Sequence, residues 1–371
     1  MRIAIICAAL LSGQNFLSVN ATPVARWSEA KANAWYAKQP WLVGCNFTPS
    51  TAINQLEMWQ AETWDPQTID RELRWAHDLG FTSVRVFLHD LVWKNDRAGL
   101  LKRMDQFLTM ARRHQIGVMF VFFDSVWDPY PHAGPQRAPR PHVHNSGWVQ
   151  SPGQDILQDP ARQDELKDYV QGVIKRFGKD RRVQVWDLFN EPDNLVPQYR
   201  GQLLSNKVAL ATLLLRKTFT WAREMEPTQP LTSGVWIGHW SDPNRLSATE
   251  WVQVEESDVI SFHTYDSLPG AQKCVQNLRR YNRPLLCTEY MARGQGSTFD
   301  PVLGYFRAQN VGAYCWGFVD GKTQTIYPWN SWDKTYTSEP QPWFHDILRR
   351  DGSPYDPKET DYIKSVTQAQ R

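Results

Sequence analysis

The 371-residue sequence has little charge imbalance and few long apolar runs. Its formal net charge is only +2, and no basic run is interleaved with aromatic residues, so neither a nucleic acid nor an anionic membrane is an expected partner. Beyond the N-terminal segment, no apolar stretch approaches the length that spans a bilayer. The sequence also lacks a Gly-rich phosphate loop after its first predicted strand, which argues against an open nucleotide-binding sheet.

Cysteine is scarce, with five residues in the whole chain. Cys7 lies in a predicted leader, and Cys45, Cys274, Cys287 and Cys315 remain as an even set that an oxidising compartment would allow to pair. Cys274 and Cys287 are suited to a helix-to-strand bridge, although buried free thiols explain them equally well. None of the spacings resembles a zinc site, so we expect no metal and no cofactor.

The first 21 residues have the pattern of a signal peptide. Arg2 precedes an apolar stretch over residues 3–11, and Val19-Asn20-Ala21 is a small-residue cleavage site, with Ala25 as a second candidate. The apolar stretch is too short to span a bilayer. The sequence therefore predicts a mature domain of residues 22–371 that is secreted or periplasmic.

Eight strand-like apolar runs alternate with helical patterns along the chain. The predicted strands are residues 42–46, 82–88, 117–123, 183–190, 230–236, 258–264, 284–290 and 312–318. Predicted helices lie between them, among them residues 67–79, 100–111 and 166–177, and a last helix with a tail falls within 343–363. This alternation predicts a parallel sheet, and eight strands predict an α/β fold of a single (β/α)₈ TIM barrel.

Two long loops follow the third and eighth predicted strands, at residues 127–153 and 320–336. In a barrel of this kind both lie on the face where sites are built, so we expect them to form walls of a site. Lys322 and Gln324 are candidate contacts to substrate hydroxyls. The histidines of the first loop, His132, His142 and His144, are better explained as part of a substrate rim than as metal ligands, because no acidic or cysteine partner is near.

Aromatic residues are abundant, with 18 Trp, 13 Tyr and 16 Phe. Many of them must pack in the core, but flat apolar rings also stack on the C–H faces of sugars, while an indole N–H can reach a hydroxyl. Together with the low net charge, the surplus of tryptophan favours a neutral carbohydrate as partner.

Polar and aromatic residues gather where the predicted strands end. A lone residue of this kind is often only a surface ion pair or a hydrogen-bonded core residue, but the whole set can meet only if the sheet closes. Two of its members, Glu191 and Glu289, supply the pair of carboxyl groups that glycosidic bond cleavage requires. The set is Asn46, Arg85, Asp124, Asn190, Glu191, His263, Tyr265, Glu289 and Trp316.

These motifs resemble those of family 5 glycoside hydrolases, in the clan of barrels whose carboxylates follow strands four and seven. The resemblance extends over nearly the whole mature chain. It depends on Asn190-Glu191-Pro192, Glu289, Val84-Arg85-Val86, His263-Thr264-Tyr265 and Trp316.

The resemblance implies a retaining mechanism with the two carboxyl groups about 5 Å apart. Glu191 would be the acid/base, which needs a raised pKa, and Glu289 would be the nucleophile. Arg85 would keep Glu289 ionised, and Tyr265 would orient it. His263 would help to cycle the proton. The sugar itself would meet Asn190 at its 2-hydroxyl and Trp316 beneath its ring.

One position departs from the family pattern. Family members usually have a histidine at the end of the third strand, where this chain has Asp124, followed by Trp127. The sugar hydroxyls contacted there are therefore expected to differ, and Trp148 in the following loop is a further candidate for sugar contact. The sequence resembles a divergent branch of the family.

The sequence thus predicts a retaining β-glycosidase that acts on a neutral, β-linked oligosaccharide or polysaccharide without a cofactor. Two alternatives use the same residues: a transglycosylase, which passes the sugar to another hydroxyl, and a glycan-binding barrel without turnover. Retention of both carboxylates argues against the second, because binding alone does not need them. The sugar, the linkage, the choice between internal and terminal cleavage, and the oligomeric state stay open.

Overall fold

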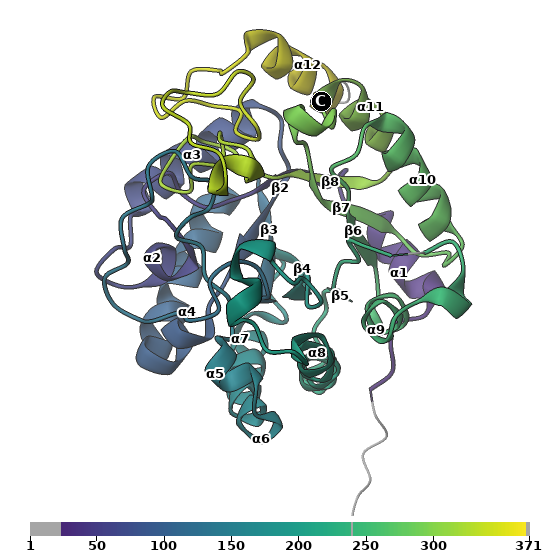
Figure 1. Ribbon diagram of the computed structural model, residues 1–371. Coiled ribbons are helices and arrows are strands. Elements are labelled where there is room, and N and C mark those ends of the chain that lie inside the picture. Colours follow the sequence, from purple (N-terminus) through teal and green to yellow (C-terminus); the bar gives the residue numbers. More distant parts are fainter. Residues whose placement is uncertain (1–23, 239, 369–371) are drawn as a thin grey trace, which may run out of the picture.

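In the computed structural model, which describes residues 24–238 and 240–368, eight parallel strands are surrounded by helices (Figure 1). The strands are β1 (Val43–Asn46), β2 (Ser83–Phe87), β3 (Gly117–Asp124), β4 (Val183–Asn190), β5 (Leu231–Thr232), β6 (Ile260–His263), β7 (Leu285–Tyr290) and β8 (Gly312–Cys315). The longer helices are α1 (Glu29–Tyr36), α3 (Pro66–Asp78), α4 (Asp90–Arg113), α7 (Lys167–Phe177), α8 (Lys207–Arg223), α9 (Ala248–Glu256), α10 (Leu268–Arg279), α11 (Phe299–Ala308) and α12 (Pro357–Thr367). The short helices are α2 (Gln55–Trp59), α5 (Gln154–Leu157), α6 (Pro160–Gln163), η1 (Asp164–Leu166), η2 (Pro197–Gln202), η3 (Pro243–Arg245), η4 (Arg293–Gln295) and η5 (Trp329–Trp332).

The sheet closes into a barrel, as the sequence predicted. Its strand order is β5-β4-β3-β2-β1-β8-β7-β6, so β1 pairs with both β2 and β8. The last gap, between β5 and β6, is bridged by Val235 beside Phe262: the Val235 N–H donates to Ser261 O, and the Val235 carbonyl accepts from the His263 N–H. The (β/α)₈ fold therefore brings the carboxyl ends of all eight strands to one face.

The helices form where the sequence supplies caps and apolar stripes. At the start of α3, the Asp65 side chain accepts a hydrogen bond from the Thr68 backbone N–H, and Pro66 occupies the first turn. Ile69, Leu73 and Ala76 recur at helical spacing along α3 and are buried in the core. None of the helices in the described part of the chain combines the length and apolarity that crossing a membrane requires.

The barrel interior is divided between an apolar half and a polar half. A buried cluster fills it near the N-terminal ends of the strands, made of Tyr36, Leu42, Met119, Val185, Val259, Leu286 and Tyr314. Toward the carboxyl ends of the strands, the interior is filled by buried polar side chains such as Arg85 and Asp187. The polar half is the half that faces the long loops.

Several details differ from the sequence-based expectation. β5 is shorter than the predicted 230–236, because the chain leaves the β4 edge after Thr232 and touches β6 only at Val235. α4 begins ten residues before Leu100 and bends at Asp96, whose backbone is not helical. Residues 343–355 form no helix, and the last helix is α12 alone.

The cysteines of the described residues form no disulfide. Cys45, Cys274, Cys287 and Cys315 are all free thiols, so the bridge between Cys274 and Cys287 is not formed. The predicted signal peptide and its boundary at residue 22 lie outside the described residues and stay predictions.

Candidate active site

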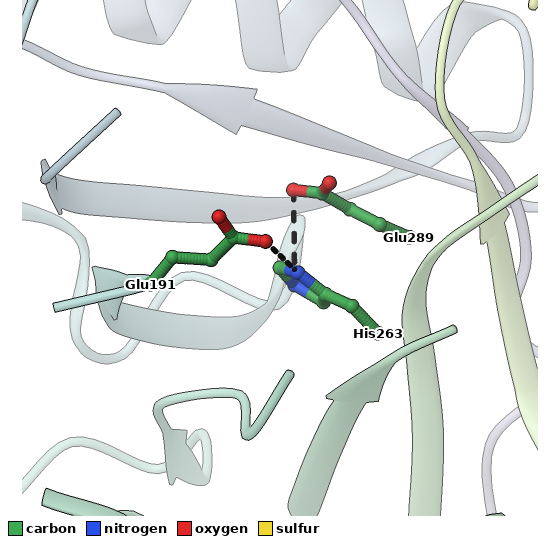
Figure 2. A group of neighbouring side chains, drawn as sticks. All are labelled: Glu191, His263 and Glu289. Carbon is green, nitrogen blue, oxygen red and sulfur yellow. Dashed lines mark hydrogen bonds and ion pairs between the residues drawn. The ribbon is translucent and has the colours of Figure 1, made fainter. Parts of the chain in front are cut away.

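The residues singled out from the strand ends meet in one place at the carboxyl face of the barrel. Figure 2 shows Glu191 and Glu289 extending toward one another from opposite sides of the view, with the His263 ring beside their inner oxygens. A carboxylate oxygen of each glutamate and a ring nitrogen of His263 all lie within 4.8 Å of one another. Retaining glycosidases hold their two carboxyl groups about 5–5.5 Å apart, and inverting ones about 6.5–9.5 Å. The nearest oxygens of this pair are thus no farther apart than the carboxyl groups of the shorter class.

Arg85 on β2 is the hub of the site. Its side chain is fully buried, and its guanidinium lies 3.0 Å from Glu289 Oε1 and 2.9 Å from Asp187 Oδ2. It also donates to the side-chain oxygens of Asn46, at 2.8 Å, and Asn190, at 2.7 Å. Asn46 in turn donates to backbone carbonyls of β7 and β8. Arg85 therefore fixes Glu289 and Asn190 relative to each other.

Glu289 at the end of β7 is held from two sides. Arg85 contacts its Oε1, and the Tyr265 hydroxyl donates to its Oε2 at 2.7 Å. Burial raises the pKa of Glu289, the neighbouring Glu191 raises it further, and His263, Arg85 and Tyr265 act in the opposite direction. The guanidinium contact specifically favours the ionised carboxylate, which is the form that a nucleophile needs.

Glu191 directly after β4 has a different environment. Among the described residues, no lysine or arginine forms an ion pair with it; its Oε2 accepts from Asn194 Nδ2 at 2.6 Å, and its Oε1 lies 2.7 Å from His263 Nδ1. Burial raises the pKa of Glu191 to about 7, and the Asn194 hydrogen bond limits the rise. A carboxyl group that is protonated near neutral pH is suited to general acid catalysis.

His263 at the end of β6 lies between the two carboxyl groups. Burial lowers the pKa of His263 to about 4, so the ring is neutral at pH 7. When Glu191 is protonated it can donate to Nδ1, and the ring proton must then sit on Nε2, which lies 3.7 Å from Glu289 Oε1. The protonation state of Glu191 is thus coupled to the tautomer of His263.

Asp124 at the end of β3 organises the side of the site away from the carboxylate pair. Its carboxylate accepts from Trp148 Nε1 at 2.6 Å and from Asn190 Nδ2 at 3.0 Å, with a longer contact from Gln55 Nε2 at 3.4 Å. Burial raises the pKa of Asp124 to about 6, although these donors oppose the rise. Asp124 therefore orients Trp148 and Asn190 instead of standing free in the cavity.

A cavity of about 380 Å³ lies above these residues. Its wall contains both glutamates, Asp124, Asn190, Tyr265, Trp316, and the predicted loop tryptophans Trp127 and Trp148. The rings of Trp148 and Trp316 meet edge to face at 5.9 Å, and both contact Phe87. Flat aromatic faces beside a small number of fixed polar groups are typical of a carbohydrate site.

Asn46 and His263 do not line the cavity and act on it through Arg85 and the glutamates. Lys322 and Gln324, the candidate contacts to substrate hydroxyls, do not line the cavity. Lys322 pairs with Glu57, and Gln324 bonds to the backbone of the β3 loop at His142 and Arg140. Both side chains therefore hold loops together.

The expected rim histidines are partly built into the same loops. His144 lines the cavity but is buried, and its Nδ1 bonds to the Tyr327 carbonyl. The His142 ring bonds to the Tyr336 carbonyl. Both therefore join the β3 and β8 loops, whereas the partner of His132 is the adjacent Ala133 carbonyl, at 3.5 Å.

Sequence reasoning missed several residues of the site. Asn194 and Trp236 line the cavity, and Trp236 donates to Asp193 at 2.7 Å. Lys207, at the start of α8, is buried and donates to the carbonyls of Ser125 and Asn194, so it joins the β3 and β4 loops. No sequence signal singled out Lys207, whereas Trp236 is the last residue of the predicted strand 230–236.

Glu191, His263 and Glu289 are also residue types that bind metal ions, and their ligand atoms are close enough to share one. However, each is already hydrogen-bonded within the site, and the Arg85 guanidinium touches Glu289 where a cation would bind. The cation of Arg85 opposes a second positive charge there. The arrangement suits proton transfer better than metal binding.

The site thus combines a (β/α)₈ barrel with two carboxyl groups that face each other at the carboxyl ends of its strands. No protein-family model matches this chain, and no curated protein matches it. The solved structures that share its fold include glycoside hydrolases of family 5, at low sequence identity.

Three of these structures illustrate the likeness. A GH5_18 enzyme from Streptomyces cattleya, in complex with Manb1-4GlcNAc, has a TM-score of 0.60 and 13% identity, covering 90% of this chain and 81% of its own. An exo-β-1,4-mannosidase from an Opitutaceae bacterium has a TM-score of 0.60 and 18% identity, covering 88% of this chain and 59% of its own. The β-mannanase of the blue mussel Mytilus edulis has a TM-score of 0.54 and 16% identity, covering 81% and 93%.

Proposed function

We propose that this chain is a retaining β-glycosidase of the family 5 type, which hydrolyses a neutral β-linked glycan. The observation that carries the proposal is the pair of buried glutamates whose oxygens lie within 4.8 Å and whose surroundings differ. Glu289 touches a guanidinium, whereas burial raises the pKa of Glu191 to about 7. One carboxyl group is thereby favoured as nucleophile and the other as acid.

In the first step, Glu289 attacks the anomeric carbon while the bond to the leaving oxygen breaks and the proton of Glu191 moves to that oxygen. In the second step, a water molecule replaces Glu289 at the anomeric carbon and gives its proton to Glu191. Tyr265 and Arg85 hold Glu289 in line for both steps. Asn190, oriented by Arg85 and Asp124, is the group that meets the sugar 2-hydroxyl.

Substrate class is proposed from the cavity and from the neighbours. The lining of tryptophan and uncharged amide groups suits a neutral sugar. Since the structures with this fold include mannanases and a mannosidase, β-mannosides lead the panel to be tested, with β-glucosides and β-xylosides beside them.

The test uses a dinitrophenyl β-glycoside, whose leaving group needs no acid, with sodium azide as external nucleophile. Glu191→Ala should still form the covalent intermediate, and azide should then give the β-glycosyl azide. Glu289→Ala should lose at least about a thousandfold of the wild-type rate, and azide should give the α-glycosyl azide. Glu62→Ala, at an exposed position, is the matched control. Turnover unaffected in both variants would refute the proposal.

We also propose export, because the first 21 residues have a signal-peptide pattern. N-terminal sequencing of the mature protein from the source cell should begin at Thr22. A mature protein that begins at Met1 would contradict export through this peptide.

A further inference from the structure

The loops after β3 and β8 are joined to each other across the site. The backbone N–H of Asn145 donates to Thr323 O at 2.9 Å, and the backbone N–H of His144 donates to Ser331 Oγ at 3.0 Å. Trp332 Nε1 returns a hydrogen bond to His144 O at 2.8 Å. The combined loop pair is therefore a single packed unit.

The tryptophans of this unit form what we call the end wall: Trp127 and Trp148 of the β3 loop and Trp332 of the β8 loop. The rings of Trp127 and Trp332 stack at 5.2 Å with an angle of 10°. Trp127 and Trp148 are nearly inaccessible to solvent, at 7% and 2%. Polar contacts within the loops and a stacked ring pair make the end wall rigid.

The joined loops also cover the ends of β1 and β2. In Figure 1 the loop after β8 lies on the side of α3 and β2. The backbone N–H of Lys322 donates to Ser50 O, and Asn54 and Gln55, after β1, donate to the carbonyls of Gly147 and Val149. A cleft cannot leave the barrel mouth through this side.

The helix η5 extends the cover as far as β6. Trp329, at its start, packs edge to face on Tyr265 at 5.1 Å, while Trp332, at its end, lies on Trp127 beside β3. The covered part of the mouth thus runs from β6 through β7, β8, β1 and β2 to β3. The β4 loop adjoins the covered part, because Tyr199 of η2 packs edge to face on Trp332 at 5.7 Å. The uncovered part lies between the β4 loop and β6, over β5.

Exposed apolar side chains mark the uncovered part. Leu195 in the β4 loop is 45% exposed, and Ile237 after β5 is 55% exposed. Each adjoins a residue of the cavity lining, Asn194 and Trp236 respectively. Large exposed apolar side chains beside a cavity mouth favour contact with a ligand that extends outward.

The two carboxylates lie at different places around this mouth. Glu191, the proposed acid, follows β4 at the border of the uncovered part, and Glu289, the proposed nucleophile, lies on β7 within the covered part. The leaving group must lie beside the acid, and the sugar that is attacked must lie beside the nucleophile and over Trp316. The sugar at the non-reducing side of the bond therefore meets the end wall.

We infer that the enzyme acts from chain ends and removes one sugar at a time from the non-reducing end. This inference rests on the proposed function. The cavity of about 380 Å³ agrees with it, since ligand pockets span roughly 300–1,000 Å³ and this one lies near the lower limit.

The direct test follows β-linked manno- and gluco-oligosaccharides that carry a fluorescent tag at the reducing end. Labelled products that shorten by one sugar at a time, with free monosaccharide from the first time point, are expected. Early appearance of several labelled lengths would show internal cleavage and overturn the inference. Early release of the labelled terminal sugar would place the end wall on the leaving-group side and overturn it as well.

Trapping reagents separate this inference from the proposed function. Dinitrophenyl β-glycosides fluorinated next to the anomeric carbon accumulate the covalent intermediate, which intact mass spectrometry detects. The monosaccharide reagent should label Glu289 at least about tenfold faster than the corresponding β-linked disaccharide reagent. Faster labelling by the disaccharide would overturn the end wall and leave the glycosidase standing. Absence of both labelling and hydrolysis across the panel would remove the proposed function itself.

A variant of the end wall completes the test. Trp332→Ala removes the stack on Trp127 and the hydrogen bond to His144, so the disaccharide reagent should gain access and the tenfold preference should shrink. Trp251→Ala on α9, where the ring is 44% exposed, is the matched control and should keep the preference. An unchanged preference in folded Trp332→Ala would contradict the role of the end wall; if that variant does not fold, the product pattern of the native enzyme still decides.

Discussion

At the scale of single residues, the site depends on giving two identical side chains different surroundings. Glu191 and Glu289 are both buried, and burial raises the pKa of each. Only Glu289 has a cation in contact, because Arg85 reaches it from β2. Glu191 instead has two neutral partners, Asn194 and His263. Position relative to Arg85 decides which carboxyl group keeps its proton.

The pH dependence of kcat/KM follows from these surroundings. The acid must be protonated, so activity should fall as pH rises through the pKa of Glu191, about 7. The nucleophile must be ionised, so activity should also fall as pH decreases through the pKa of Glu289. In Asn194→Ala the carboxylate of Glu191 loses a hydrogen bond that favours its charged form, and the alkaline limb should move upward by about one pH unit.

The measurement is the pH–rate profile with an unsubstituted phenyl β-glycoside, whose poor leaving group needs the proton of the acid. Asn244→Ala, at an exposed position after β5, is the control and should keep the wild-type limb. If the alkaline limb of Asn194→Ala stays in place or moves to lower pH, a group other than Glu191 causes that limb.

At the scale of elements, the barrel strands were predictable because each is buried on both faces and reads as a nearly continuous apolar run. The start of β3 and both ends of β4 agree with the predicted runs. The predicted runs 82–88 and 284–290 contain β2 and β7, so they placed Arg85 and Glu289 on strands. β5 was overextended because Val235 and Trp236 continue the apolar pattern after the strand has left its neighbour.

The loops were not predictable in the same way, because their contacts join residues far apart in the sequence. Lys322 reaches Glu57 after β1, and Gln324 reaches the backbone of His142 after β3. Nothing in the local pattern of either loop indicates these partners. The length and the tryptophan content of the loops predicted that they form walls of the site, but did not predict which side of the cavity they close.

The pairing of β1 with β2 leads to a prediction about stability. Gly44 lies so near β2 that an added Cβ would stand 1.7 Å from the Ser83 carbonyl oxygen. Because that oxygen is backbone, Gly44→Ala should push the two strands apart and lower the free energy of unfolding by about 1–3 kcal/mol or more. Urea unfolding followed by tryptophan fluorescence measures this. Gly201→Ala, where an added Cβ meets nothing within 4 Å, should match the wild type, and equal stability of both variants would contradict the strand contact.

At the scale of the whole molecule, the stability of the barrel depends on packing without disulfides. The four described cysteines are free, and burial raises the pKa of the Cys45, Cys287 and Cys315 thiols. High pKa values and burial make these thiols unreactive. Thermal unfolding should therefore give the same Tm with and without a reductant. A Tm that falls by several degrees in the reductant would reveal a bridge.

The barrel also explains why the residues of the site could be predicted from the sequence, whereas the shape of the cavity could not. Parallel strands deliver their carboxyl ends to one face, so Asn46, Arg85, Asn190, His263 and Glu289 had to meet once the sheet closed. The shape of the cavity depends on how the β3, β4 and β8 loops pack on each other. The strands therefore determine which catalytic residues meet, and the loops determine which shape of substrate fits the cavity.

The central claim is that Glu289 forms a covalent intermediate which water then replaces, so that the sugar keeps its configuration. The measurement that tests it most directly is proton NMR of the first product, recorded during rapid hydrolysis of the β-glycoside that the enzyme turns over fastest. The β-anomer should appear first and the α-anomer later, by mutarotation. An α-anomer that appears first would mean single-step inversion and would contradict the account.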